Sequence, residues 1–352
     1  MSVSTPDPIT HPHPDAPLGA VVRAIYRAGD GHLVTDCPPG RIPEAVDDRD
    51  GTIWVDFMAA KEEGTREVEA WLHDVFPFHH LAVEDALQET NVPKVDDWGT
   101  YLYIVFRVPY LADGSDVLEL HELDAFVGPN YLVTFHVAPM AILEAERAGI
   151  ARDPRDRLQN GPDHLLFRLL ERAVDQSLTV IEQLDDRVDD LQNHIIERPS
   201  SSVLRTIFRI KRSAIQLHKT LAPQREVLNR LARDPYGPIR EDHRVYFRDL
   251  YDHLVRIHDI SESLRDLIAG TLETYLSVIS NRTNEIMKTL TMVTVMFLPM
   301  SFLAGFFGMN FFGEPLALQA RLPRGLLFAS TCAIMAISPC FMWIYAKRKR
   351  WF

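Results

Sequence analysis

Two uncharged apolar runs near the C-terminus dominate the hydropathy pattern of this chain. The first covers 289–313 and the second covers 325–346, and neither contains Asp, Glu, Lys or Arg. A helix of about 20 apolar residues crosses the roughly 30 Å hydrocarbon core of a bilayer, and each run reaches that length. The loop between the helices, 310–324, is too short to form a domain. The pattern therefore predicts a hairpin of two transmembrane helices.

Basic residues predict how this hairpin is oriented. Arg282 and Lys288 precede the first run, and the second run is followed by the basic segment 347–350, whereas the loop carries only Arg321 and Arg324. The excess of Lys and Arg on the side of the termini places both termini in the cytoplasm by the positive-inside rule. Residues 1–17 lack the apolar core of a secretory signal, which agrees with that orientation.

Long helices are predicted between residue 163 and the first span. Apolar residues recur at helical spacing through 163–197, and a second helix is expected from 200–202 to about 232. The sequence Asp-Pro-Tyr-Gly-Pro at 234–238 is a break. A third helix is expected to begin near 239 or 240 and to continue without a strong stop before Asn310. About 70 helical residues rise roughly 100 Å, so this helix joins a cytoplasmic stalk to the membrane.

The N-terminal part mixes strand and helix patterns. Short segments rich in Val, Ile, Phe and Tyr predict strands at 20–28, 52–58, 101–108, 117–127 and 131–136. Helices are predicted at 62–75 and 79–87. This mixture is typical of a compact α/β domain. The sequence has no Gly-rich phosphate loop and no nucleophile elbow, so we do not expect an enzyme.

These patterns give a fold class and a domain order. The fold class is an α+β cytoplasmic domain with a long stalk helix and two C-terminal transmembrane helices. The expected segments are a flexible N-terminus (1–17), an α/β domain (18–160), long antiparallel helices (161–238), the stalk helix (239–288), the first span (289–310), the outer loop (311–324), the second span (325–346) and a basic C-terminus (347–352).

The amino-acid composition limits the kinds of partner that this chain can bind. The mean hydropathy of −0.09 conceals the segregation of apolar residues, and the net charge is −12 with a pI of about 5.6. Because nucleic-acid binding needs a basic face, an acidic chain argues against such a partner. The sparse cysteines Cys37, Cys332 and Cys340 provide no disulfide framework, which fits a reducing compartment for the large N-terminal part. The acidic segment 182–197 is interpreted as a solvated helix face.

The first span carries features that suit a water-filled path. Pro299 frees a backbone carbonyl within the membrane, and hydroxyls occur at Thr291, Thr294 and Ser301. Small residues, among them Gly305, permit close approach of helices. A single hairpin cannot enclose a pore, so conduction requires several copies around an axis, and we expect a homo-oligomer.

The run NRTNEIMKTLTMVTVMFLPMSFLAGFFGMNFF, residues 281–312, makes the sequence recognisable. It ends a span with Gly308-Met309-Asn310, precedes a short loop and is followed by a second span ending KRKRW. In this it resembles the first membrane helix of the CorA family of magnesium channels. The segments 81–107 and 245–254 also resemble that family, so the resemblance covers nearly the whole chain. It implies a homopentamer in the cell (inner) membrane, with the second span outside the pore ring.

The resemblance assigns a selectivity filter to Gly308, Met309 and Asn310. Counting back from Asn310 at helical spacing gives the face that lines the pore in the family: Asn284, Met287, Leu290, Thr294, Leu298, Ser301 and Gly305. Mg²⁺ holds its waters tightly and prefers oxygen ligands, so a ring of neutral Asn310 amides can bind the hydrated ion without stripping it.

Within that face, Asn284 would form an inner polar ring, and Met287, Leu290 and Leu298 would form apolar constrictions that gate by dewetting. Glu314 in the outer loop is expected to attract cations. Arg321 and Arg324 in the same loop weaken that attraction.

The resemblance also implies a regulatory metal site between subunits, formed by Asp85 and Asp249. Two carboxylates brought together repel each other, and a bound Mg²⁺ relieves that repulsion. Cytoplasmic Mg²⁺ would then hold the closed state. Mg²⁺ is thus expected as both transported and regulatory ion, without an organic cofactor, and the other expected partners are membrane lipid and further copies of the chain.

Two other interpretations stay open. A zinc transporter of the same superfamily shares the Gly-Met-Asn motif, although zinc prefers His and Cys and the 14 His of this chain are scattered. A membrane-anchored metal sensor or scaffold that conducts nothing would tolerate substitution of Asn310.

Overall fold

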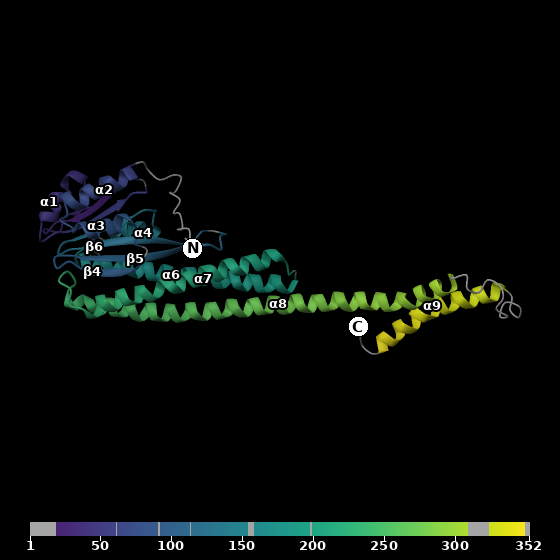
Figure 1. Ribbon diagram of the computed structural model, residues 1–352. Coiled ribbons are helices and arrows are strands. Elements are labelled where there is room, and N and C mark those ends of the chain that lie inside the picture. The colour runs from purple at the N-terminus through teal and green to yellow at the C-terminus, as the bar shows by residue number, and fades with distance from the viewer. Residues whose placement is uncertain are drawn as a thin grey trace, which may run out of the picture. The chain divides into compact units, whose positions relative to one another are not determined.

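The computed structural model describes residues 19–60, 62–90, 92–112, 114–153, 158–197, 199–308 and 324–348. By internal contacts the chain divides into two compact units, Met1–Leu272 and Glu273–Phe352. Figure 1 shows a sheet with helices on both faces, followed by the long helix α8 and the C-terminal helix α9.

The sheet has seven strands in the order β2-β1-β3-β7-β6-β5-β4. β3 and β7 pair in parallel, with Ile53 opposite Tyr131, and the other neighbouring strands pair antiparallel. The interior strand β3 is rich in β-branched and aromatic residues and is buried along nearly its whole length, which is typical of a strand covered on both faces. The strands are β1 (Val21–Arg27), β2 (Leu33–Val34), β3 (Thr52–Met58), β4 (Lys94–Asp97), β5 (Leu102–Leu111), β6 (Leu118–Val127) and β7 (Tyr131–His136).

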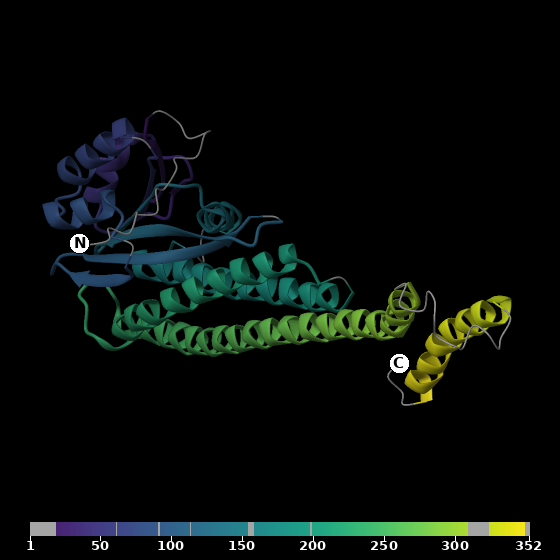
Figure 2. The same cartoon turned by 45° about the vertical axis from the view of Figure 1, so that its right-hand side comes forward.

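Short helices cover one face of this sheet. They are the 3₁₀ turn η1 (Pro39–Arg41), α1 (Ile42–Asp47), α2 (Glu62–Asp74) and α3 (His80–Leu87), and their apolar residues join one buried core with the sheet. Figure 2 shows α6 (Pro162–Glu197) and α7 (Ser201–Arg233) against the opposite face, with α4 (Ala141–Arg152) preceding them in the chain. The Ser200 hydroxyl caps α7 by accepting a hydrogen bond from the Val203 amide at 3.4 Å.

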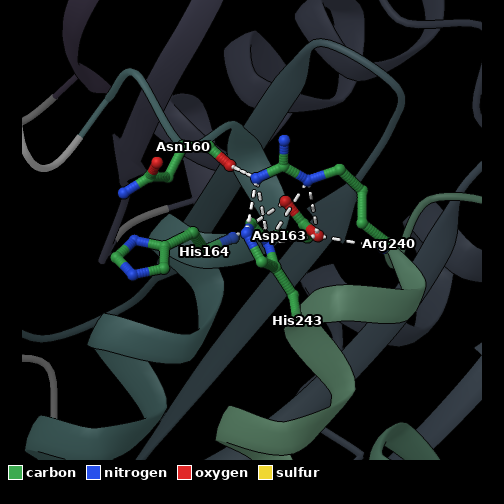
Figure 3. Close-up of polar contacts among 5 residues, drawn as sticks. All are labelled: Asn160, Asp163, His164, Arg240 and His243. Carbon is green, nitrogen blue, oxygen red and sulfur yellow. Dashed lines mark hydrogen bonds and ion pairs between the residues drawn. The ribbon is translucent and has the colours of Figure 1, made fainter.

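α8 (Arg244–Gly308) is a single helix of 65 residues, and α9 (Arg324–Arg348) follows it. α8 begins later than residue 239 or 240, where the apolar pattern places its start, because a 3₁₀ turn, η2 (Glu241–His243), precedes it. Figure 3 shows the cause: the buried Asp163 carboxylate accepts a hydrogen bond from the Arg240 backbone N–H at 3.0 Å and one from His243 Nδ1 at 2.8 Å. These bonds hold the connector against the start of α6.

Among the described residues, one helix is long and apolar enough to cross a membrane. It is α8, whose most apolar 18-residue window has a mean hydropathy of 1.7. α9 contributes a shorter apolar stretch, Cys332–Tyr345. The first predicted span is therefore present as a membrane-competent helix, and the second span stays a prediction.

Candidate functional site

The seven residues expected to line a pore all lie on α8, and all are exposed in the single chain. Leu298 is 66% exposed and Leu290 is 58% exposed, values that would be unfavourable for apolar side chains facing water on their own. The half-buried residues of the same stretch lie on another side of the helix, by their spacing; they are Met292, Val295, Met296, Pro299, Met300 and Leu303. The predicted pore face is thus free to meet other copies of the chain or an axis.

The hydroxyls of this helix bond to their own backbone. Thr294 Oγ1 donates to the Leu290 carbonyl at 2.9 Å, and Thr291 Oγ1 donates to the Met287 carbonyl at 2.7 Å. Each hydroxyl therefore uses its hydrogen within the helix and keeps oxygen lone pairs as acceptors. Neutral oxygen acceptors are suited to the water molecules of a hydrated cation, which donate hydrogen bonds.

The outer end of this face reaches the limit of the described residues. Gly308 is the last residue of α8. Met309, Asn310 and Glu314 lie outside the described residues, so their roles as filter and cation-attracting residues stay predictions.

Asp85, one of the two predicted regulatory acids, has a cation as its partner. It lies on α3, and Lys94 Nζ of β4 is 2.5 Å from its Oδ2 and 2.8 Å from Asp96 Oδ2. The same ammonium lies 5.0 Å from the centre of the Tyr103 ring. Burial lowers the pKa of Lys94, but the hydrogen bonds to Asp85 and Asp96 outweigh it and raise that pKa above its ordinary value. A divalent ion that binds Asp85 Oδ2 would therefore compete with Lys94.

Asp249, the second predicted regulatory acid, lies exposed near the start of α8. One turn further on, His253 Nδ1 is 3.9 Å from Asp175 Oδ1 of α6. The described part of the chain contains no group of three or more His, Cys, Asp and Glu side chains that could hold a metal ion. The pair of Asp85 and Asp249 therefore stays a prediction about neighbouring subunits.

Buried acids that the sequence pattern does not reveal lie behind Lys94. The Tyr103 hydroxyl donates to Asp124 Oδ1 at 2.6 Å, and Asp124 is 1% exposed. Burial, and then the nearby Glu122 carboxylate, raise the pKa of Asp124 well above its usual range, which favours its neutral form. In the sequence, Asp124 is one acid within a predicted strand. Its inward position becomes evident only once the pairing of β5 with β6 is known.

Comparison with known families gives a match over most of the chain. A family described as "CorA-like Mg2+ transporter protein" matches residues 49–348. The cobalt/magnesium transport protein CorA of Thermotoga maritima is 33% identical over 278 residues, covering 79% of this chain and 78% of that protein. The zinc transport protein ZntB of Cronobacter sakazakii is 26% identical over 285 residues, covering 77% of this chain and 81% of that protein.

The fold also matches a solved structure. The complete structure of the CorA magnesium transporter from Methanocaldococcus jannaschii aligns with a TM-score of 0.77, covering 94% of this chain and 99% of that one at 23% identity. The alignment therefore extends over nearly the whole length of both chains.

Proposed function

Because the chain belongs to the family of CorA-like Mg²⁺ transporter proteins, we propose that it is a channel that carries Mg²⁺, together with Co²⁺ and Ni²⁺, into the cell. The family consists of ion transporters and not of enzymes. The observation that carries the proposal is the family match over residues 49–348. The exposed α8 face with its uncharged oxygen acceptors supports it.

The proposed pathway passes a ring of Asn310 side chains and then descends along α8. Neutral amides and hydroxyls bind the water shell of Mg²⁺ weakly enough for release, whereas a ring of carboxylates would retain the ion. Leu298, Leu290 and Met287 supply the apolar constrictions that close the path by dewetting. Asn284 forms the inner polar ring.

The proposed assembly is a homopentamer in the cell membrane with both termini in the cytoplasm. Its support is the exposure of the whole predicted pore face in one chain. Apolar side chains such as Leu298 are covered when five copies of α8 surround a common axis. The second span, 325–346, lies outside this ring, in contact with lipid.

The driving force is the membrane potential. A divalent ion that crosses about 100 mV gains roughly 4.6 kcal/mol, because each elementary charge gains about 2.3 kcal/mol. That is enough to favour inward flow without a nucleotide site. Cytoplasmic Mg²⁺ bound between Asp85 and Asp249 of neighbouring subunits holds the closed state, so that uptake is limited by its own product.

Zinc transport is the second candidate, since the zinc transport protein of Cronobacter sakazakii resembles this chain over 285 residues. Zinc prefers His and Cys ligands. The 14 His of this chain are scattered along the sequence, which makes magnesium the better supported ion. A non-conducting sensor would have the same fold, so only a flux measurement distinguishes it from a magnesium channel or a zinc transporter.

Ion uptake into liposomes tests the proposal. Purified full-length protein is reconstituted, an inside-negative potential is imposed, and uptake of Mg²⁺ and Zn²⁺ is compared for wild type and Asn310→Ala. We expect potential-driven Mg²⁺ uptake in the wild type and its loss in the variant. Asn281→Ala is the matched control, because Asn281 lies on α8 before the first predicted pore-lining residue, Asn284.

Each other outcome assigns a different function. Zn²⁺ uptake without Mg²⁺ uptake moves the assignment to zinc transport. The absence of flux of either ion, from protein shown to be folded and inserted, favours the sensor. Equal Mg²⁺ flux through wild type and Asn310→Ala contradicts the selectivity role of Asn310 and leaves the channel itself standing.

A further inference from the structure

A cavity of about 340 Å³ lies between α8 and α9, within the unit Glu273–Phe352. Its position is toward the start of the α8 span and the end of α9, the ends that the proposed topology places on the cytoplasmic side. It is lined by Lys288, Thr291, Met292, Val295 and Met296 of α8 and by Met342 and Tyr345 of α9.

The lining is apolar apart from one end. Three of the seven lining residues are methionines, whose unbranched, polarisable side chains adapt to a flexible apolar ligand. Thr291 donates its hydroxyl hydrogen to the Met287 carbonyl at 2.7 Å, so it offers no hydrogen-bond donor to a ligand in the cavity. Among the described lining residues, Lys288 is the one that carries a charge.

Lys288 lies at the depth of lipid headgroups. It is the last charged residue before the uncharged run 289–313, so the hydrocarbon core begins directly beyond it. On α9, Lys347 Nζ lies 5.2 Å from the centre of the Trp343 ring, and Tyr345 lines the cavity itself. Trp, Tyr and basic residues gather at the membrane interface, so these residues mark the same level on α9.

We propose that this cavity binds an anionic phospholipid of the cytoplasmic leaflet. One acyl chain lies among Met292, Val295 and Met296, and the headgroup phosphate pairs with Lys288. Basic pockets between membrane helices on the cytoplasmic side are suited to anionic lipid headgroups. A lipid held there contacts α8 on the side away from the predicted pore face, where it can stabilise the packing of α9 on α8. This site goes beyond the proposed ion transport and rests only on the proposed membrane topology of the two helices.

Lipid retention by the purified full-length protein tests the site. The protein in detergent is incubated with phosphatidylglycerol or with phosphatidylcholine of the same acyl chains, and retained lipid is measured by native mass spectrometry. We expect the wild type to retain phosphatidylglycerol more tightly. Lys288→Gln reduces that preference about fivefold, the factor for roughly 1 kcal/mol per basic residue near the membrane surface. Met296→Trp fills the cavity and lowers retention of both lipids.

Two matched variants control for nonspecific effects. Arg282→Gln removes a basic residue that does not line the cavity, and Phe297→Trp introduces the same ring at the next position, which is 59% exposed. Both are expected to retain lipid as the wild type does. Because Lys288 is exposed, its substitution is expected to leave the fold intact even if Met296→Trp disturbs the packing of α9.

The outcomes that overturn the lipid site are distinct. Equal retention of the two lipids by the wild type, or equal effects of Lys288→Gln and Arg282→Gln, contradicts headgroup recognition. Full lipid retention by Met296→Trp contradicts the location. If Met296→Trp instead changes the number of copies in the assembly without changing lipid retention, a second copy of the chain occupies the cavity. Ion flux is not part of the readout, so failure of the transport proposal leaves this result unaffected.

Discussion

At the scale of single residues, Lys94 would compete with a metal ion for Asp85 in the proposed regulatory site. Its ammonium lies 2.5 Å from Asp85 and 2.8 Å from Asp96. We expect Lys94→Met to lower the Mg²⁺ concentration that closes the channel by about two- to fivefold, which corresponds to the roughly 0.3–1 kcal/mol of a partly exposed ion pair. The measurement is Mg²⁺ uptake as a function of Mg²⁺ on the cytoplasmic side.

Arg248→Gln is the control for this prediction. It removes one positive charge beside Asp249 without removing a contact to Asp85. If both variants shift the closing concentration equally, general electrostatics rather than competition by Lys94 is responsible. If Asp85→Asn and Asp249→Asn leave closure unchanged, the regulatory site itself is refuted.

A buried ion cluster on β3 and β7 gives the cytoplasmic domain a pH dependence. His136 Nε2 lies 3.4 Å from Asp56 Oδ1, and Arg147 of α4 donates to Asp56 Oδ2 at 3.1 Å. Burial lowers the pKa of His136, but Asp56 and the Ala138 carbonyl outweigh it and raise that pKa above 6.5, with Glu144 adding to the effect. Burial opposes the ionised form of Asp56, but His136 and Arg147 outweigh it and keep the pKa of Asp56 below its usual value of 3.8.

The sign of the pH effect follows from these directions. A raised pKa of His136 adds stability that is complete below pH 6.5 and is lost as pH rises through the folded-state value. The contribution of Asp56 to stability is constant across this pH window, because it is lost only at lower pH, where the carboxylate is protonated. We expect His136→Gln to cost on the order of 1–3 kcal/mol below pH 6.5, and the difference from wild type to shrink as pH rises. Thermal unfolding of the purified protein against pH measures it, and a pH-independent difference contradicts the assignment.

Single residues were the hardest level to predict from sequence. The face containing Asn284, Thr294 and Leu298 followed from helical spacing, because positions along one helix fix one another. The contact of Lys94 with Asp85 could not be predicted, since it depends on β4 lying beside β5 at the sheet edge. Buried charges such as Asp56 look like surface acids until the strand is known to be covered on both faces.

At the scale of elements, Asp163 ties the start of α6 to the connector before α8. Its side chain is 2% exposed and meets His243 at 2.8 Å and the Arg240 guanidinium at 3.7 Å. We expect Asp163→Ala to destabilise the protein by about 3 kcal/mol, the low end for breaking a buried ion pair, because Arg240 stays half exposed. Thermal or denaturant unfolding measures this. Asp189→Ala, an exposed acid of α6, should stay within about 0.5 kcal/mol of wild type.

The α8 span makes a separate prediction about gating. If Leu298 forms an apolar constriction, Leu298→Ser removes about 1.5–3 kcal/mol of apolar character from each subunit, and leak at saturating cytoplasmic Mg²⁺ should rise about tenfold or more. Val293→Ser changes an exposed residue on another side of the helix and should not leak. An unchanged leak in Leu298→Ser means that this position does not close the path.

Elements themselves were largely predictable. β3 and β7 have the expected bounds, and α2, α3, α6 and α7 lie within one or two residues of expectation. The sequence pattern did not predict β2, which has two residues, or β4, whose Lys94 and Asp96 give it a polar pattern. The helices α1 and α4 were not predicted either. α8 begins at Arg244 and not at 239 or 240. The contacts before its start join Arg240 and His243 to Asp163, which lies 77–80 residues earlier, so the local pattern could not predict them.

At the scale of the whole molecule, the predicted pore and the predicted regulatory site both need more than one copy of the chain. The predicted pore face of α8 is exposed, and Asp85 and Asp249 lack the additional ligands of a metal site within the described residues. The pore face would be covered if α8 faces an axis, and the two acids would gain ligands if they meet across subunit boundaries. In the proposed pentamer, function is a property of the assembly, and its test must vary the composition of the assembly.

Mixed assemblies provide that test. If five copies each contribute one Asn310 to a single ring, coexpression of wild type with an equal amount of Asn310→Ala leaves only about one assembly in 32 without a variant subunit. Should one variant subunit suffice to disrupt the ring, Mg²⁺ uptake must fall far below half of the wild-type value. Uptake that falls in direct proportion to the wild-type fraction indicates instead that each chain conducts alone, which would contradict a shared pore. The copy number is checked independently from the mass of the detergent-solubilised assembly, for which each chain contributes 40.2 kDa.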